Sequence, residues 1–112
     1  MGMVLPEKGH LLRIFIGESD KRNGIPLYEW IVKKAREQGL AGATVTRGIL
    51  GFGAHSRIHT TKILRLSEDM PMIIEIVDTL EKIDNFLPLI DHTIKEGLAI
   101  IEEIHIRFYR TR

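Results

Sequence analysis

The stretch Leu11-Leu-Arg-Ile-Phe-Ile16 decides where the fold begins, because β-branched and aromatic residues favour a β-strand. Gly17 ends this strand, and the polar run from Glu18 to Gly24 predicts a loop after it. Both faces of the strand carry apolar side chains, although Arg13 lies among them. A strand that is apolar on both faces is expected at the centre of a sheet.

Two amphipathic helices are predicted further along the chain. Apolar residues between Leu27 and Gln38 recur at spacings of three and four, and a glycine follows in the position of a helix stop. A second stripe of helical spacing reaches Ile94, and Asp78 with Glu81 forms a capping pair at its start. Because Pro88 removes a hydrogen bond inside this stripe, we expect the second helix to kink there or to divide in two.

The remaining segments favour strands and one long loop. Ala43 to Leu50 is short and β-prone, and it leads into a glycine-rich polar loop from Gly51 to Lys62. Ile63 to Leu66 is a candidate return of that loop. Met72 to Val77 resumes as a strand, and Leu98 to Tyr109 alternates apolar with polar residues as a strand does.

The order strand, helix, strand, strand, helix, strand is the split βαβ plan of ferredoxin-like folds. We therefore predict one α+β domain over residues 1–112, in which a four-stranded antiparallel sheet carries both helices on one face. The other face is then uncovered and has a mixed composition. Its expected residues are Leu11, Arg13, Phe15, Glu75, His105, Arg107 and Tyr109. This composition suits packing between copies of the chain, so we expect a homo-oligomer.

Composition argues against several classes of protein. The chain has no cysteine, which excludes disulfides and cysteine-ligated metals, and its 16 basic and 15 acidic residues give a net charge of +1. A nucleic-acid binder normally carries a basic excess, so no nucleic-acid partner is predicted. No apolar run reaches the roughly eighteen residues of a membrane span, and the first residues lack the pattern of a signal peptide. We expect a cytoplasmic protein.

Several motifs together resemble a known family. Gln38-Gly-Leu-Ala-Gly-Ala-Thr-Val-Thr-Arg-Gly-Ile-Leu-Gly-Phe-Gly53 resembles the stretch of PII signalling proteins that runs into their mobile T-loop, and Pro71 to Val77 is similar to their third strand. Leu12 to Asp20, Pro26 to Glu29 and Ser56 to His59 more closely resemble the PII-like family catalogued as domain of unknown function 190.

The resemblance implies an assembly and a function. It implies a trimer of ferredoxin-like subunits whose inter-subunit clefts bind an adenine nucleotide, ATP, ADP or AMP, as an effector and not as a required cofactor. A mobile loop at about residues 50–62 would then control an unidentified protein target, such as a membrane transporter. Under this reading the protein is not an enzyme.

Residue by residue, the resemblance also implies a binding site. Thr44 matches the threonine on the adenine side of the PII cleft, and Gly51 and Gly53 match the glycines at the base of the T-loop. On the last strand, His105 and Arg107 stand where PII proteins carry two arginines that approach the phosphates. The chain departs from PII proteins at residues 95–99, where a G-D-G-K turn is replaced by a segment with one glycine.

The residues in and beside the predicted loop are also chemically suited to bind a phosphate. Glycines let backbone N–H groups approach an anion, and the nearby cations Arg47, Arg57 and Lys62 could neutralise a phosphate. The alternative is a glycine-rich hairpin tip with solvated charges. Together with the resemblance, these residues complete the predicted nucleotide site: Thr44, Arg47, Gly51, Gly53, Arg57, Lys62, His105 and Arg107.

A second functional class stays open as an alternative. His55 and His59 are four positions apart, a spacing common in zinc sites, but they lie in a predicted loop that contains no carboxylate. No metal site is therefore predicted, and a small trimeric metal-binding protein of the same fold remains the alternative. No Ser-His-Asp arrangement or other catalytic motif is recognisable in the sequence.

Overall fold

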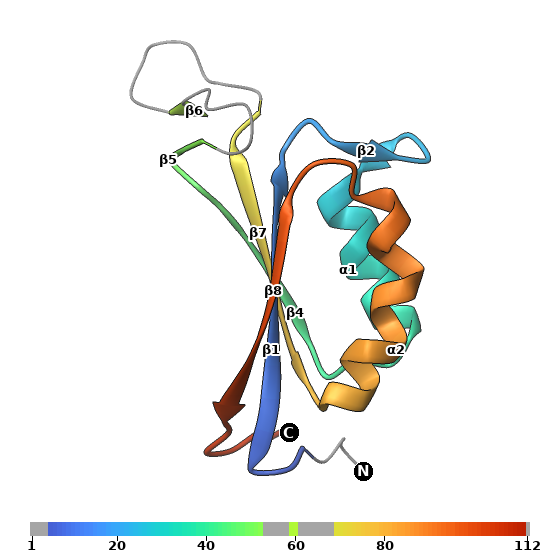
Figure 1. Ribbon diagram of the computed structural model, residues 1–112, viewed down its shortest axis with the longest axis vertical. Coiled ribbons are helices and arrows are strands. Elements are labelled where there is room, and N and C mark those ends of the chain that lie inside the picture. Colours follow the sequence, from blue (N-terminus) through green and yellow to red (C-terminus); the bar gives the residue numbers. More distant parts are fainter. Residues whose placement is uncertain (1–4, 53–58, 61–68, 112) are drawn as a thin grey trace.

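The computed structural model describes residues 5–52, 59–60 and 69–111. The main elements follow the predicted order of strand, helix, strand, strand, helix, strand (Figure 1). They are β1 (Lys8–Gly17), α1 (Leu27–Glu37), β4 (Ala43–Arg47), β7 (Pro71–Asp78), α2 (Leu80–Ile90) and β8 (Leu98–His105). No helix in these residues is long and apolar enough to cross a membrane. Most of the predicted loop and its predicted return at 63–66 lie outside the described residues.

β1 and β7 form the centre of the main sheet. They pair antiparallel, from His10 opposite Asp78 to Gly17 opposite Pro71. β8 pairs with the other edge of β1, and β4 pairs with the other edge of β7, so the strand order is β4-β7-β1-β8. The prediction of a central first strand in a four-stranded antiparallel sheet is confirmed.

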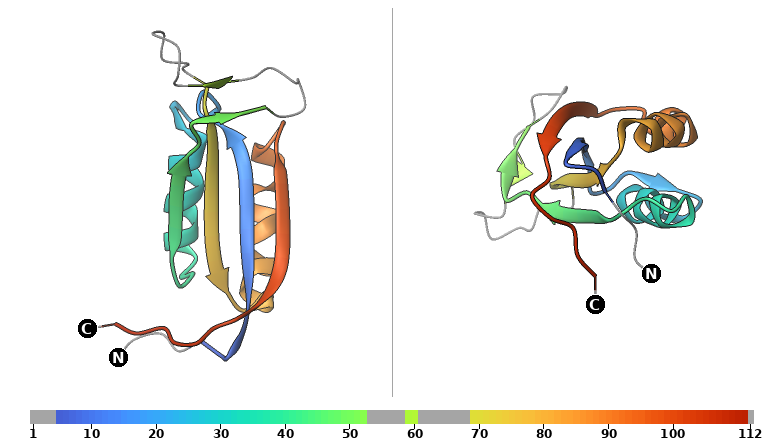
Figure 2. Two further views of the ribbon diagram at one scale, coloured as in Figure 1. Left: turned by 90° about the vertical axis from the view of Figure 1, so that its left-hand side faces the viewer. Right: turned by 90° about the horizontal axis from the view of Figure 1, so that it is seen from below.

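Both helices cover the same face of this sheet. Figure 1 shows the sheet from its edge with α1 and α2 on one side, and the left view of Figure 2 shows the four strands in front of both helices. The core between them comes from alternate strand positions and from one stripe of each helix. Its main side chains are Leu12, Ile14, Ile16, Met72, Ile74, Ile76, Leu27, Ile31, Ala35, Ile83, Phe86 and Ile90. Burial of each larger apolar side chain contributes about 1.5–3 kcal/mol.

The opposite sheet face is uncovered in the single chain. The alternate positions of the two central strands project from it, and they are partly buried: Leu11, Arg13, Phe15, Ile73, Glu75 and Val77. Arg13 lies directly opposite Glu75, and its Nε donates to Oε2 of Glu75 at 2.9 Å. Its Nη1 lies 3.5 Å from Oε1 of Glu102. The positive charge of Arg13 in the middle of this apolar face is therefore balanced by two carboxylates, which leave one negative charge in excess.

The predicted position of His105 on this face is wrong. β1 pairs Leu12 with Ile101 and Lys8 with His105, and paired residues of an antiparallel ladder project from the same face. Because Leu12 faces the helices, His105 belongs to the helix side. There its Nε2 lies 3.2 Å from the carboxylate of Glu7.

Two short hairpins interrupt the main elements. β2 (Lys21–Arg22), which lies where the sequence predicted only a loop, pairs with β3 (Ile25–Pro26). Asn23 and Gly24 form the turn with φ values of 53° and 80°. Left-handed backbone at both positions is typical of the tight type I′ hairpin turn, which asparagine followed by glycine favours.

The strand predicted from Ala43 to Leu50 ends earlier, at Arg47. The chain leaves the edge of the sheet at Gly48, whose N–H donates to the carbonyl of Pro71 at 2.7 Å. A Cβ at Gly48 would lie 3.0 Å from the Pro71 ring, so this close approach favours glycine. Beyond it, β5 (Leu50–Gly51) pairs with β6 (His59–Thr60) in a separate two-stranded sheet.

The second helix differs from its prediction at both ends. Thr79, not Asp78, is the N-cap, and its hydroxyl accepts from the N–H of Lys82 at 3.3 Å. Asp78 ends β7 instead. At the other end, α2 continues through Pro88 and stops at Ile90, where the short 3₁₀ helix η1 (Asp91–Thr93) follows. The helix therefore does not divide at the proline, although it ends before the predicted limit.

The last strand ends at His105, whereas the sequence predicted it to continue to Tyr109. β1 offers no further pairing residue beyond Lys8, and the N–H of Ile106 donates instead to the carbonyl of Glu7 at 2.7 Å. Residues 106–111 then cross the end of the sheet toward the start of β4, as the left view of Figure 2 shows. The alternation of apolar and polar residues up to Tyr109 was misleading here, because a strand also needs a neighbouring strand with which to form hydrogen bonds.

Candidate functional site

The base of the long loop is closed by three segments that are distant in sequence. Nε of Arg47, the last residue of β4, lies 3.0 Å from each carboxylate oxygen of Glu18 in the turn after β1. The N–H of Glu18 donates to the carbonyl of Met70 at 2.9 Å, and the N–H of Met70 lies 3.4 Å from Oε1 of Glu18. The hydrogen bond between Gly48 and Pro71 completes this loop base.

The turn beside the loop base is acidic. Both the N–H and the hydroxyl of Ser19 donate to Oδ1 of Asp69, at 3.0 and 2.8 Å. Oδ2 of Asp20 accepts from the N–H of Gly17 at 3.1 Å. Burial raises the pKa of Asp20, and the negative charges of Asp69 and Glu96 add to this effect, while the hydrogen bond from Gly17 opposes it. Sequence patterns assigned no role to any of these carboxylates.

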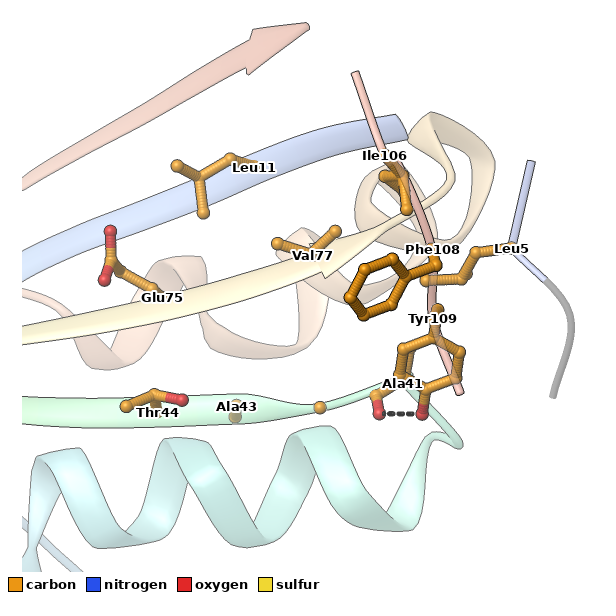
Figure 3. A pocket seen from close by; sticks show the side chains of 11 residues that line it. Leu5, Leu11, Ala41, Ala43, Thr44, Glu75, Val77, Ile106, Phe108 and Tyr109 are labelled. Atoms are coloured by element: carbon orange, nitrogen blue, oxygen red, sulfur yellow. Dashed lines mark hydrogen bonds between the residues drawn. The ribbon is translucent and has the colours of Figure 1, made fainter. Parts of the chain in front are cut away.

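A groove of about 620 Å³ lies on the uncovered sheet face (Figure 3). The strands form the floor of this groove, and the C-terminal segment that crosses the sheet forms one wall. The lining residues drawn on the strands are Leu11, Ala43, Thr44, Glu75 and Val77, and those drawn on the terminal segments are Leu5, Ile106, Phe108 and Tyr109. The hydroxyl of Tyr109 donates to the carbonyl of Ala41 at 2.7 Å and holds this wall in place.

Among the predicted site residues that the structure describes, Thr44 is the one that lines this groove. It is exposed and lies opposite Glu75 in the ladder of β4 and β7. Phe108 was not considered in the sequence prediction as a groove residue, and Tyr109 was placed on a strand face. The sequence feature that could have indicated them is the pair of adjacent aromatic residues, Phe108 and Tyr109, which follows the last residue of β8 that pairs with β1.

The other predicted site residues lie apart. Arg47 and Gly51 belong to the loop end of the sheet, whereas His105 ends β8 and the exposed Arg107 follows it at the other end. His105 pairs with the start of β1, while Arg47 pairs with Met72 near the end of β1. This separation is roughly 25 Å at the rise of a β-strand. One subunit therefore does not bring the predicted phosphate contacts together.

Three predicted site residues, Gly53, Arg57 and Lys62, lie outside the described residues. His55 of the metal alternative lies outside them as well, and only the backbone of His59 is described. Among residues 5–52, 59–60 and 69–111 there is no group of three His, Asp or Glu side chains that could hold a metal ion. The metal alternative gains no support from this part of the chain.

Comparison with known proteins establishes the family. The DUF190 family, described as "Uncharacterized ACR", matches residues 9–106. This chain belongs to the DUF190 family. It is 38% identical over 99 residues to a UPF0166 protein of Aquifex aeolicus, covering 88% of this chain and 93% of that protein. A UPF0166 protein of Methanocaldococcus jannaschii is 40% identical over 100 residues, which cover 88% of this chain and 92% of the relative.

Solved structures place this DUF190 chain among proteins with the PII-like fold. CPII from Thiomonas intermedia K12, a nitrogen regulatory PII-like protein bound to ADP, AMP and bicarbonate, aligns with a TM-score of 0.67 over 88% of both chains at 16% identity. A putative PII-like signalling protein from Thermus thermophilus gives a TM-score of 0.63 at 16% identity over 88% of this chain and 89% of that one. Likeness at this level of identity shows the fold.

Proposed function

We propose that this DUF190 protein is a PII-like regulatory protein that binds an adenine nucleotide in clefts between copies of the chain and controls a partner protein through its long loop. The fold of the chain is PII-like, and CPII of the same fold binds ADP and AMP. The predicted cation Arg47 stands at the base of the loop, so bound phosphate and loop would meet at one place.

The observation that carries this proposal is the arrangement of Thr44 and Arg47 on β4. Both residues are exposed and lie three positions apart, about 10 Å along the strand. This span is comparable with the reach from the base to the phosphates of an adenine nucleotide. Thr44 lies opposite Glu75 and Arg47 lies opposite the core residue Met72, so their side chains project from opposite faces at the edge of the sheet. Because β4 is the edge strand of the main sheet, a ligand that passes over its outer edge can reach both side chains.

A second copy of the chain supplies what one subunit lacks. His105 and Arg107 lie at the opposite end of the sheet, so they reach the Arg47 side of a nucleotide only from a neighbouring subunit. The uncovered sheet face favours such packing, because its apolar side chains are only partly covered in the single chain and its Arg13 is paired with Glu75 and Glu102. The expected assembly is the homotrimer.

Isothermal titration with ATP, ADP and AMP, combined with light scattering, tests the proposal. We expect a trimer that binds at least one of the three nucleotides. Thr44→Val should weaken binding by about fivefold, since a lost hydrogen bond of about 1 kcal/mol has that effect. Thr44→Ser keeps the hydroxyl and is the matched control. A monomer, or a trimer that binds none of these nucleotides, would contradict the proposal.

A further inference from the structure

The loop base contains an ion pair that occupies the predicted phosphate contact. Both carboxylate oxygens of Glu18 lie 3.0 Å from Nε of Arg47. The two side chains are 25% and 38% exposed, so water surrounds them only in part. An ion pair in such a setting is screened less than a fully exposed one. In this structure, Arg47 already has an anion beside it.

Glu18 also connects the two ends of the loop. Its side chain reaches β4 through Arg47, and its N–H and carboxylate both contact the backbone of Met70, just before β7. The hydrogen bond from Gly48 to Pro71 lies beside these contacts. Any movement of the Glu18 side chain therefore changes what holds the end of β4 to the start of β7.

We infer that Glu18 is an internal competitor for the anion site of Arg47, and that a phosphate bound there takes its place and releases this link across the loop base. The identity of the ligand as a phosphate-bearing nucleotide rests on the proposed function; the competition itself rests on the ion pair. One guanidinium carries one positive charge, and two anions within a few ångströms of it repel each other.

The consequence is a coupling between ligand and loop base. A ligand shifts a conformational equilibrium only by its different affinity for the two states. A phosphate that binds Arg47 more tightly after Glu18 has left meets this condition. The state in which Glu18 holds both Arg47 and Met70 is the unliganded one, and the liganded state has Arg47 on the phosphate and Glu18 in solvent.

Titration of Glu18→Gln with ADP and, separately, with inorganic phosphate tests the competition. Glutamine has nearly the same size, but it carries no charge, and its amide oxygen is a weaker acceptor for the N–H of Met70 than the carboxylate is. Removal of the competing charge should tighten binding of both probes by about fivefold relative to the wild type. Glu29→Gln, which makes the same charge change beside Lys33 on α1, is the matched control and should bind like the wild type.

A double-mutant cycle shows whether the gain acts through Arg47. In the background of Arg47→Gln, the substitution Glu18→Gln should bring no further gain, because the site for which Glu18 competes is missing. An equal gain with and without Arg47 would overturn the inference. Circular dichroism and light scattering check that each variant folds and assembles. If Glu18→Gln does not fold, Glu18→Asp, whose shorter side chain reaches Arg47 less well, is tested instead.

Hydrogen exchange at the amides of Gly48 and Met70 tests the link without relying on affinity. Without ligand, both amides should exchange faster in Glu18→Gln than in the wild type. Addition of ADP to the wild type should bring its exchange toward that of the variant. Unchanged exchange in Glu18→Gln would overturn the link across the loop base.

The two probes separate the inference from the proposed function. ADP binding that is unaffected by Glu18→Gln overturns the inference and leaves the proposed function standing. A gain with inorganic phosphate, but no binding of ADP, ATP or AMP by either protein, supports the competition and contradicts the proposed function. Absence of binding by both probes to both proteins overturns the competition, and the proposed function falls with it if ATP and AMP do not bind either.

Discussion

The hydroxyl of Tyr109 donates a hydrogen bond of 2.7 Å to the carbonyl of Ala41, 68 positions earlier in the chain. This contact fastens the C-terminal segment across the end of the sheet and forms one wall of the groove that contains Thr44 (Figure 3). Tyr109→Phe should therefore loosen that wall and lower the free energy of unfolding by about 0.5–1.5 kcal/mol. Urea unfolding measures the change, with Tyr28→Phe on α1 as the control. Equal losses in the two variants would contradict a specific role for Tyr109.

The buried carboxylate of Asp78 joins the end of β7 to the start of β4. It is 1% exposed and accepts from the N–H of Thr79 at 2.7 Å and from the N–H of Ala41 at 2.9 Å. Asp78→Ala leaves both donors without this acceptor, at a cost of about 1–3 kcal/mol for each donor that stays buried. Asp78→Asn keeps one acceptor and should lose less. Chemical unfolding of both variants gives the comparison, and equal losses would show that cavity formation dominates.

Phe15 is a test of the uncovered face as a subunit interface. It lies on that face opposite Ile73 and Leu98. Phe15→Asp would bury an unpaired charge between subunits, which costs several kcal/mol, so light scattering should show a smaller species at micromolar concentration. Gln38→Asp, at an exposed position after α1, adds the same charge and should leave the assembly intact. Loss of the fold before dissociation would instead mark Phe15 as part of the core of a single chain.

The raised pKa of Asp20 should make the free energy of unfolding depend on pH. Its pKa is raised from the ordinary value of 3.8, chiefly by burial, so the folded state holds this proton more tightly than the unfolded chain does. Its contribution to stability is complete below pH 3.8 and is lost as the pH rises through the raised pKa. Asp20→Asn cannot ionise but can still accept from Gly17. Urea midpoints measured from pH 3 to 7 should therefore move in favour of the variant as the pH rises.

The control for Asp20 is Asp84→Asn, a substitution at an exposed position on α2. Its difference from the wild type should vary less over the same pH range. A constant difference between Asp20→Asn and the wild type would mean that Asp20 is equally acidic in the folded and unfolded states.

Arg107 tests the contribution of a neighbouring subunit to nucleotide binding. If Arg107 contacts a phosphate, Arg107→Ala should weaken binding by about tenfold or more, since a charge-assisted hydrogen bond is worth roughly 1.5–3 kcal/mol. Arg107→Lys should recover part of this loss, because lysine keeps the charge and loses the planar fork. Titration calorimetry measures both. Unchanged affinity with an intact trimer would move the phosphate site away from the C-terminal segment.

Trimers that contain two different variant chains test whether Arg107 and Arg47 of one binding site come from different copies of the chain. Trimers refolded from an equal mixture of Arg47→Gln and Arg107→Ala chains should contain some clefts with both arginines intact, if the two come from neighbouring subunits. Such mixtures should recover tight sites that neither variant has alone. No recovery would indicate that both arginines act within one subunit or that one of them makes no contact.

The sequence by itself determined the elements and their order. The run from Leu11 to Ile16, with apolar side chains on both faces, predicted that β1 is a central strand, and the pairing with β7 and β8 confirms it. The helical stripe that begins at Leu27 predicted α1 to within one residue at its end, because local periodicity and a following glycine are enough to define a helix. The family resemblance read from 12–20 and 26–29 is confirmed by the match to the DUF190 family.

Only the tertiary structure decided where the polar side chains go. Alternation alone continued the last strand to Tyr109 and placed His105 on the uncovered face, whereas the register with β1 ends the strand at His105 and turns this residue to the helix side. Glu18 and Arg47 are 29 positions apart, and no local pattern pairs them. Local propensity acts over a few residues, but register, edge pairing and ion pairs depend on which segments the fold brings together. The main helices and strands could therefore be predicted from the sequence, and the short hairpins and the contacts between segments could not.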